Sequence, residues 1–291
     1  MMNVKLETKF DVIEASHYGM CFGVKAAIKA AEKLSAMRPV TVLGELAHNA
    51  SVKRGLESRG VSHGKLEADS AVTKNVLITA HGASDKDRLR WKNQGYRVTD
   101  TTCPLVHKAH QALAQLVLAG YVPIVIGKAG HVEVRGLVGD FPSAVIVQTL
   151  DDVAGLNLDT EKIGVISQTT QQITHVEVMV QAIRERHPEA QVKFVDTVCK
   201  PTKERQQALL DLCSQVKLVI VVGGSNSNNT AQLADKCRKL GCRAYHVQSP
   251  SDLKAAWFDN VERVGLTAGT STPQSDISAV KRKLMKMSRG S

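Results

Sequence analysis

Short runs of β-branched and aliphatic residues alternate along this chain with longer amphipathic stretches, and that order restricts the folds it can adopt. Neighbouring parallel strands need a helical crossover between them, so strand–helix alternation predicts α/β units around parallel sheets. We expect strands at 11–15, 40–43, 76–79, 122–126, 144–148, 163–166, 193–195, 218–222, 243–247 and 263–267. Helical patterns include 24–35, 108–119, 175–186, 202–214 and 230–240. Ligands of such folds bind in the loops that follow the strands.

A short motif recurs where two of these strands end and a helix opens. It reads Asp-Thr-Thr-Cys-Pro at 100–104 and Asp-Thr-Val-Cys-Lys-Pro at 196–201, and the segment 16–21 ends in a cysteine without the Asp-Thr. Three such units predict three similar small α/β lobes in a pseudo-threefold arrangement around a common centre. The expected lobes are 17–103, 104–197 and 198–291, with the segment 1–16 as a candidate to pack on the third. Two units would explain the Asp-Thr-X-Cys pair almost as well.

Cys21, Cys103 and Cys199 lie where a predicted strand ends and a helix opens, and there unsatisfied N–H groups and the helix dipole stabilise negative charge. A thiol in that position loses its proton more easily, and the thiolate is the form that binds iron. Three convergent thiolates would hold three irons of a cubane cluster and leave the fourth open. Burial is the alternative for each of them, because a single cysteine is more often a small hydrophobic residue than a ligand. The other cysteines lie within or just after helical patterns and are expected to be packing or surface residues: Cys213, Cys237 and Cys242.

Composition limits the class of protein and its partners. Hydrophobic residues make up 43% of the chain, no run of 18 apolar residues occurs, and the N-terminus lacks a signal-peptide core, so we expect a cytoplasmic protein without membrane contact. The formal net charge of +10 favours an acidic partner or a phosphorylated substrate. Nucleic acid is not expected, because aromatic residues make up only 4% and no binding motif appears. The basic residues of 281–289 are expected to form a solvated helix face.

Polar and glycine-rich segments follow most of the predicted strands: 44–49, 81–82, 130–136, 167–170, 223–230 and 268–271. Short loops of this kind at helix starts direct several N–H and hydroxyl donors at one point, which suits a phosphate group. Three histidines and one glutamate lie among them: His48, His81, His131 and Glu133. Ordinary helix caps and packed histidines are the alternative for each segment. Nucleotide binding finds little support, since neither a Walker motif nor a GxGxxG after a first strand is present.

Nine short motifs, each weak alone, follow one another along the chain. They are Gly-Met-Cys-Phe-Gly-Val at 19–24, Glu-Leu-Ala-His-Asn at 45–49, Ala-His-Gly at 80–82, Thr-Cys-Pro-Leu-Val at 102–106, Gly-His-Val-Glu-Val at 130–134, Ser-Gln-Thr-Thr at 167–170, Val-Cys at 198–199, Asn-Ser-Asn-Asn at 226–229 and Thr-Ala-Gly-Thr-Ser at 267–271. In order and spacing they resemble the motifs of the IspH (LytB) family of 4-hydroxy-3-methylbut-2-enyl diphosphate reductases, and the resemblance runs from about residue 17 to residue 285.

The resemblance implies an iron–sulfur enzyme of the non-mevalonate route to isoprenoids. Its three lobes would surround a central [4Fe–4S] cluster with one open iron, and two electrons would remove the hydroxyl group to give isopentenyl and dimethylallyl diphosphates. The implied cluster ligands are Cys21, Cys103 and Cys199. The implied diphosphate contacts are His48, His81, His131, Ser227, Asn228, Asn229 and Ser271. The implied catalytic residues are Glu133 as a proton relay, Thr169 as the residue that orients the substrate hydroxyl, and His131.

Four positions depart from the family pattern. Val132 stands where proline is frequent, Arg135 where an acidic or neutral residue is common, Asn228 where serine is frequent, and Gln232 where arginine is frequent. They leave open a paralogous cluster protein that acts on another substrate. A non-catalytic redox-sensing or nucleic-acid-binding protein on the same scaffold is a further alternative, which the charge favours and the presence of Glu133 and Thr169 opposes.

Electrons for such a reduction must come from outside the chain, because the sequence shows no nicotinamide or flavin motif. An acidic ferredoxin or flavodoxin that docks on the basic surface is the expected donor.

Overall fold

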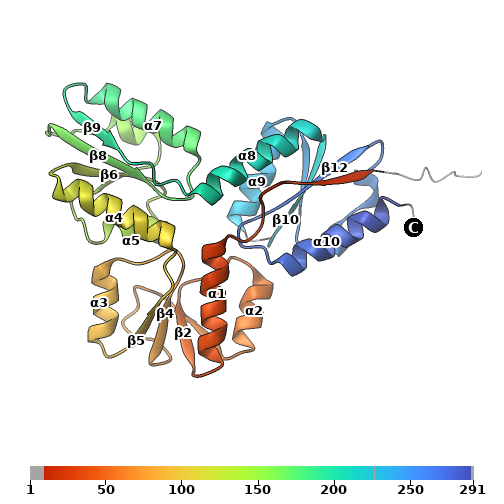
Figure 1. Cartoon of the computed structure of the whole chain (residues 1–291), viewed down its shortest axis with the longest axis horizontal. Coiled ribbons are helices and arrows are strands. Elements are labelled where there is room, and N and C mark those ends of the chain that lie inside the picture. The colour runs from red at the N-terminus through yellow and green to blue at the C-terminus, as the bar shows by residue number, and fades with distance from the viewer. Residues whose placement is uncertain (1–9, 226, 290–291) are drawn as a thin grey trace, which may run out of the picture. The chain divides into compact units, whose positions relative to one another are not determined.

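The described part of the chain folds into three four-stranded sheets, all of whose strand pairs are parallel (Figure 1). The structure is a computed structural model that describes residues 10–225 and 227–289. The expected α/β class with three small lobes is therefore confirmed.

The first lobe has a sheet in the order β3-β2-β4-β5. Its elements and the helices next to them in the chain are α1 (Phe22–Ser35), β2 (Val40–Leu43), α2 (Ala50–Glu57), β3 (Val61–Gly64), β4 (Asn75–Ile78), α3 (Asp85–Asn93) and β5 (Arg97–Asp100). Apolar side chains of β4 pack with Trp91 of α3, which is completely buried. The central strands β2 and β4 are nearly continuous apolar runs, as expected where both faces of a parallel sheet are covered.

The second lobe has a sheet in the order β7-β6-β8-β9. Its elements are α4 (Pro104–Leu118), β6 (Val122–Ile126), α5 (Val132–Val138), β7 (Val145–Val147), α6 (Leu150–Ala154), β8 (Lys162–Ser167), α7 (Ile173–Arg186) and β9 (Gln191–Phe194). Ile124 and Ile126 enter one hydrophobic core while Val125 enters another. Because side chains alternate along a strand, these two cores cover the two faces of the sheet.

The third lobe has a sheet in the order β1-β12-β10-β11. Its elements are β1 (Asp11–Glu14), α8 (Lys200–Gln215), β10 (Leu218–Val222), α9 (Asn228–Lys239), β11 (Arg243–Val247), the 3₁₀ turns η1 (Pro250–Asp252) and η2 (Ala255–Trp257), β12 (Arg263–Ala268) and α10 (Gln274–Met287). The strand β1 comes from the N-terminal part of the chain and pairs with β12. All five residues of β10 are buried, alternately in two cores on opposite faces.

These lobes form two compact units. The first two sheets lie in the unit of residues 23–46 and 56–203, and the third sheet lies with the described residues of 1–22, 47–55 and 204–291. None of the described helices is long and apolar enough to cross a membrane.

Two strands in the first lobe, β3 and β5, were not expected from the sequence. Both are at the edges of the sheet, and most of their residues are half-exposed or exposed: Ser62 and His63 in β3 and Thr99 in β5 are half-exposed, and Arg97 in β5 is exposed. An edge strand needs no continuous apolar run, so its sequence resembles that of a loop. The ten strands that were predicted are all present, with ends that differ by a residue or two.

Candidate functional site

Each of the three singled-out cysteines directly precedes a helix, as expected. Cys21 stands before α1, Cys103 is the N-cap of α4, and Cys199 stands before α8. All six cysteines lie in the described part of the chain as reduced thiols, and these three are partly exposed. The position next to the first N–H groups of a helix favours the thiolate, which is the form needed to bind a metal.

The Asp-Thr-X-Cys repeat has a structural reason, because both copies make the same hydrogen bonds. Oδ1 of Asp100 accepts from the backbone N of Thr102 at 2.9 Å, and Oδ1 of Asp196 accepts from the backbone N of Val198 at 3.0 Å. Each aspartate thus closes a tight turn onto the residue that precedes the cysteine.

The threonine and the cysteine of each copy are tied to the neighbouring strand. The hydroxyl groups of Thr101 and Thr197 donate to the last carbonyls of β4 and β8. The backbone N of Cys103 donates to the carbonyl of Ala80 at 3.0 Å, and that of Cys199 donates to the carbonyl of Thr169 at 2.9 Å. Both cysteines are therefore fixed at the same place, just beyond the carboxyl end of a central strand.

A glycine allows helix α1 to approach one of the thiols closely. Gly23, in the first turn of α1, is so close to Cys103 that a Cβ atom on it would stand 2.8 Å from the Cys103 Sγ. Thiols that are reduced, partly exposed and placed at helix starts fit the ligand set of an iron–sulfur cluster. Among the described residues, no three His, Cys, Asp or Glu side chains are arranged to hold a single metal ion. An iron–sulfur cluster binds each cysteine through a separate iron, so its ligands need not meet at one ion.

We predict that Gly23→Ala weakens iron retention, because the new methyl group must displace the Cys103 thiol. Overpacking of this kind costs about 1–3 kcal/mol. The matched control is Gly55→Ala in α2, where a Cβ atom would meet nothing within 4 Å. Iron content and unfolding of both variants would be compared, and iron loss from the Gly55 variant alone would refute the prediction.

Glu133 is a buried acid at the start of α5. Its side chain is 1% exposed, and its Oε1 accepts from the backbone N of Thr169 at 2.6 Å. Burial raises the pKa of Glu133 from about 4.5 to about 7, against an opposing effect of the hydrogen bonds from Thr169. The backbone N of Glu133 donates to Nδ1 of His131, the N-cap of α5, at 3.2 Å. The structure thus places a carboxyl group that is partly protonated near neutral pH next to Thr169, whose carbonyl accepts from the backbone N of Cys199.

His81 and His131 lie next to each other, with ring centroids 5.6 Å apart and rings nearly perpendicular. His81 follows β4 and His131 follows β6, so the contact joins the carboxyl ends of the two sheets in this unit. Gly82, at φ +81°, lets the chain turn where a Cβ atom would stand 3.0 Å from Thr102. Two imidazoles at this edge can donate hydrogen bonds to an anion.

In the other unit, His48 lies at the loop before α2. The carbonyl of His48 accepts from the Ser271 hydroxyl at 3.4 Å, and a Cβ atom on Gly224 would stand 3.2 Å from the same carbonyl. Three loops, after β2, β10 and β12, therefore meet here. Asn49 is occupied in capping α2, because its Oδ1 accepts from the backbone N atoms of Ser51 and Val52.

The loop between β10 and α9 is held tightly. Ser227 is the N-cap of α9, and its Oγ accepts from the backbone N of Thr230. Oδ1 of Asn229 accepts from the backbone N of Thr270 at 3.1 Å, which links this loop to the one after β12. The side chain of Asn228 lies outside the described part of the structure. The capping alternative is therefore correct for Ser227, although a capping hydroxyl can still face an anion.

The sequence identifies Gly23 only as part of the motif at 19–24. Nothing in the sequence signals that its neighbour is Cys103, because the two are 80 positions apart (103 − 23). The remaining cysteines agree with the packing expectation: Cys237 and Cys242 are buried in the third lobe, with Cys213 half-buried beside them. Burial raises the pKa of the Cys242 thiol to about 11, the opposite of what a metal ligand needs.

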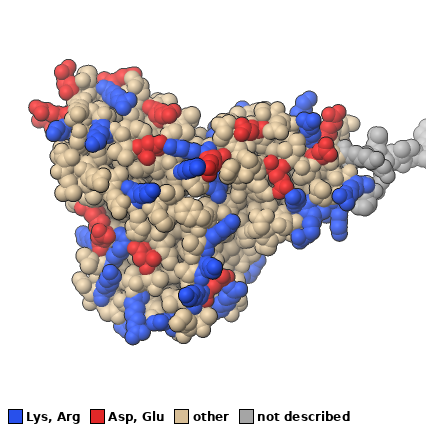
Figure 2. Space-filling view, in the orientation of Figure 1, with Lys and Arg blue, Asp and Glu red and all other residues tan. Residues whose placement is uncertain are grey.

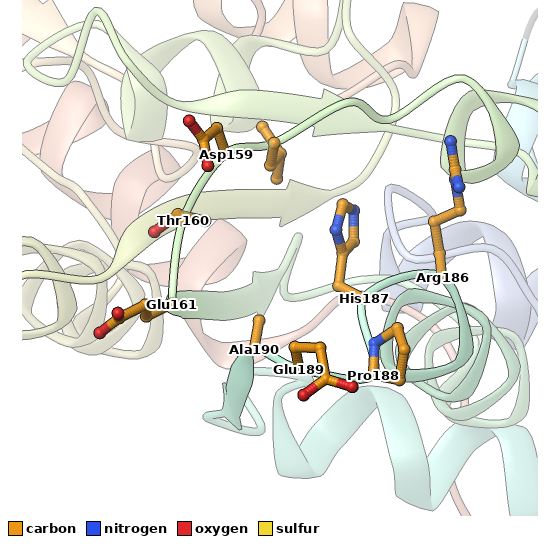
Figure 3. Close-up of a pocket in the computed structure, with 9 residues that line it drawn as sticks. Asp159, Thr160, Glu161, Arg186, His187, Pro188, Glu189 and Ala190 are labelled. Carbon is orange, nitrogen blue, oxygen red and sulfur yellow. The ribbon is translucent and has the colours of Figure 1, made fainter.

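One surface pocket, of about 600 Å³, lies in the second lobe beside the amino ends of β8 and β9 (Figure 3). It is lined by the segments 158–161 and 186–190, which precede β8 and β9. Glu161, Arg186 and His187 belong to it, and none of the candidate residues above does. The pocket is thus separate from the candidate site, which occupies the carboxyl ends of the strands.

The fold and the site define an α/β protein of parallel-sheet lobes that carries reduced cysteines at helix starts and a buried acid beside one of them. The chain belongs to the LytB protein family, whose model matches residues 12–285. The family expected from the nine motifs is thereby confirmed.

Relatives of known name are similar over nearly the whole chain. A protein of Aquifex aeolicus (strain VF5) named 4-hydroxy-3-methylbut-2-enyl diphosphate reductase is 34% identical over 286 residues, which cover 96% of this chain and 98% of that protein. One of the same name from Bacillus licheniformis is 37% identical over 274 residues, 90% of this chain and 87% of the relative.

Two solved structures are similar in fold. One is (E)-4-hydroxy-3-methyl-but-2-enyl diphosphate reductase, the terminal enzyme of the non-mevalonate pathway, with 33% identity, a TM-score of 0.73 and coverage of 95% of this chain and 99% of the other. The other is the E-1-hydroxy-2-methyl-but-2-enyl-4-diphosphate reductase of Plasmodium falciparum, with 28% identity, a TM-score of 0.86 and coverage of 95% and 88%.

Proposed function

We propose that this protein is an enzyme that reduces 4-hydroxy-3-methylbut-2-enyl diphosphate to isopentenyl and dimethylallyl diphosphates. The relatives named above support the reaction. The observation that carries it in this chain is the buried pair of Glu133 and Thr169, bonded through the Thr169 carbonyl to Cys199. A proton donor fixed beside a candidate cluster ligand is the arrangement that reductive loss of a hydroxyl group requires.

The reaction takes two electrons and two protons: the carbon–oxygen bond breaks, the oxygen leaves as water, and the allylic carbon skeleton gains a hydrogen. An iron–sulfur cluster, when bound, supplies the electrons and a Lewis-acidic iron. We assign Cys21, Cys103 and Cys199 as its ligands and [4Fe–4S] as its type, on the grounds of three thiols, one at each of three helix starts.

Glu133 is the proposed source of the proton that turns the departing hydroxyl into water. Hydroxide is a poor leaving group, and a carboxyl group with a pKa of about 7 is partly protonated at neutral pH, so it can act as a general acid. Thr169 is the proposed residue that orients the substrate hydroxyl, since its own backbone N is already fixed by Glu133. His131 caps the helix that carries Glu133, and we assign it to the catalytic residues together with Glu133 and Thr169.

The diphosphate is the proposed ligand of the polar loops. In one unit, His81 and His131 stand side by side, and in the other the loops of His48, Ser227, Asn229 and Ser271 are joined by hydrogen bonds. Asn228 is assigned to this set from its motif alone. Anchoring the diphosphate would position the reacting carbon and use remote binding energy for the chemistry.

The proposed electron donor is a ferredoxin or flavodoxin, an acidic partner for a chain of net charge +10. Lys25, Lys29 and Lys33 are exposed on one face of α1, the helix that begins beside Cys21. Figure 2 shows basic side chains running along this helix. Lys25 is about 6 Å along the helix axis from Cys21 by the rise of an α-helix, which brings the charge close to the proposed cluster.

We predict that replacing Lys25, Lys29 and Lys33 with glutamate lowers kcat/KM with ferredoxin about tenfold, because electrostatic steering is reversed. Turnover with reduced methyl viologen, which needs no docking surface, should persist. The control is the same charge change on α10, at Arg282, Lys283 and Lys286, which are also exposed. Equal losses in both variants would show that net charge matters and the α1 face does not.

The test of the proposed reaction is an anaerobic assay with reduced methyl viologen and the diphosphate substrate. We expect a brown, iron- and sulfide-containing protein that releases both diphosphate products. An intact cluster without turnover would instead favour a paralogue with another substrate or a redox-sensing protein. The cytoplasmic location of this protein stays a prediction from its sequence.

A further inference from the structure

The same backbone frame holds two of the proposed ligands in two different lobes. Asp100 and Asp196 each stand three positions before a cysteine, and each accepts a hydrogen bond from the backbone N two positions on. We propose that Asp100 and Asp196 are equivalent positioning residues, whose side-chain turns fix Cys103 and Cys199 in the direction in which they bind the cluster. This inference rests on the ligand assignment made above.

The turn acts on the cysteine through Thr102 or Val198, the residue directly before it, whose N–H the aspartate holds. Once the N–H of Thr102 or Val198 points back at the aspartate, the backbone direction at the next residue is set. That residue is the cysteine, whose own N–H then reaches the carbonyl of Ala80 or Thr169. Without the turn, the residue before the cysteine would lose the bond that holds its N–H, and the segment between strand and helix would sample more conformations.

The threonines strengthen the frame from the other side. The Thr197 hydroxyl donates to the carbonyl of Ser167 at 2.6 Å and accepts from the backbone N of Ser167 at 2.9 Å. Thr101 donates likewise to the carbonyl of Ile78. The threonine after each aspartate therefore binds the chain to the end of the neighbouring strand, β4 or β8. The turn that the aspartate closes thus starts from a fixed backbone.

The two aspartates differ in their charged partners, so removal of the charge should have a different effect at each position. Asp100 pairs with Arg88 at 2.8 Å, and the Arg88 side chain is only 12% exposed. Asp196 pairs with Lys203, whose side chain is 38% exposed. Removing the charge should therefore matter more at Asp100, where a nearly buried guanidinium loses a carboxylate, than at Asp196.

The third lobe lacks this frame and holds its cysteine differently. The segment before Cys21 has no Asp-Thr, and Gly19 within it has a φ of +72°. Nη2 of Arg205 donates to the carbonyl of Gly19 at 3.2 Å, and the backbone N of Gly19 donates to the carbonyl of Ala268 at 3.1 Å. The positioning role of an aspartate is thus confined to the two lobes that carry the repeat.

The experiment compares alanine and asparagine at Asp196. Asparagine keeps the side-chain oxygen that accepts from Val198, whereas alanine removes it. We expect Asp196→Ala to release iron to a chelator about tenfold faster than the wild type, because the net free energy of the lost hydrogen bonds corresponds to about that factor. The variant should also change the reduction potential and the electron paramagnetic resonance signal of the cluster. Asp196→Asn should restore all three readouts. At Asp100, asparagine should rescue only in part, because Arg88 then keeps Asp85 as its ion-pair partner but loses the Asp100 carboxylate.

Asp152→Ala is the matched control for simple destabilisation. Asp152 also accepts two backbone hydrogen bonds, from Gln148 and Thr149, but it caps α6, in the same lobe as the Cys199 frame and away from the cysteines. It should lower the unfolding temperature of the cluster-free protein and leave iron release and the potential unchanged. If it accelerates iron release as much as Asp196→Ala, the effect is one of general stability and the proposal is wrong.

Two further outcomes would overturn the proposal. Equal effects of alanine and asparagine at Asp196 would mean that charge and not the turn is what the cluster responds to, and wild-type behaviour of Asp196→Ala would mean that the turn is dispensable. Cys199→Ser separates these results from a failure of the ligand assignment. If that variant holds iron as the wild type does, the assignment itself falls; if it loses iron while Asp196→Ala does not, only the positioning role falls.

Discussion

Replacing Glu133 with glutamine should lower turnover by about two to four orders of magnitude while the cluster stays intact, because general acids contribute about 10²–10⁴-fold to catalysis. The glutamine oxygen can still accept from the backbone N of Thr169, so the local geometry is kept and only the acidic proton is lost. Anaerobic turnover with reduced methyl viologen measures the effect, and the iron content shows that the cluster is retained.

Glu189→Gln is the control, since Glu189 is an exposed carboxylate in the same lobe that lines the separate pocket. It should turn over at the wild-type rate. Full activity of the Glu133 variant would remove this residue from the reaction.

The protonation of Glu133 also predicts how turnover depends on pH. The pKa of Glu133 is about 7 in the folded protein and near 4.5 ordinarily, so the acid form is present below about pH 7 and is lost above it. Turnover should fall as the pH rises through 7, and this fall should be absent from the residual activity of the glutamine variant. In the cluster-free protein, the contribution of Glu133 to stability is fully present below pH 4.5 and is lost as the pH rises through about 7.

Replacing Cys103 with serine should remove most of the iron and leave no measurable turnover. The hydroxyl of serine does not ionise at neutral pH, so a thiolate ligand at the start of α4 is lost rather than replaced. Iron and sulfide analysis of anaerobically purified protein, per folded molecule, is the measurement.

Cys237→Ser and Cys213→Ser are the matched controls for this change. Cys237 is buried in the core of the third lobe and Cys213 is half-buried beside it, away from the helix starts that carry the proposed ligands. Both variants should keep their iron, although the buried hydroxyl at 237 should reduce stability by about 1–3 kcal/mol. Equal loss of iron from the Cys103 and Cys237 variants would undo the ligand assignment.

Much of the fold could be predicted because its central strands are buried on both faces. Leu218–Val222 is an uninterrupted apolar run that reads as a strand of a parallel sheet, and the structure gives it those bounds. Edge strands such as Val61–Gly64 could not be found in the same way, since their partly exposed residues carry no such pattern. The repeat of Asp-Thr-X-Cys located the helix starts at Cys103 and Cys199 correctly.

The candidate site was predictable in its residue types and not in its contacts. That Glu133 is buried and bonded to Thr169 depends on the packing of α5 against the end of β8, which is a long-range contact that no local pattern encodes. The closeness of Gly23 to Cys103 is of the same kind. The hydrogen bonds of Asp100 and Asp196 could have been suspected from the repeat itself, because aspartate two positions before a backbone N–H commonly forms such turns.

Mössbauer spectroscopy of the iron-loaded protein, before and after addition of 4-hydroxy-3-methylbut-2-enyl diphosphate, tests most directly whether three thiolates hold one cluster with an open iron. We predict a single cubane in which one iron differs from the other three, and a change confined to that iron when the diphosphate is added. Four equivalent irons that ignore a saturating concentration of the diphosphate would contradict it.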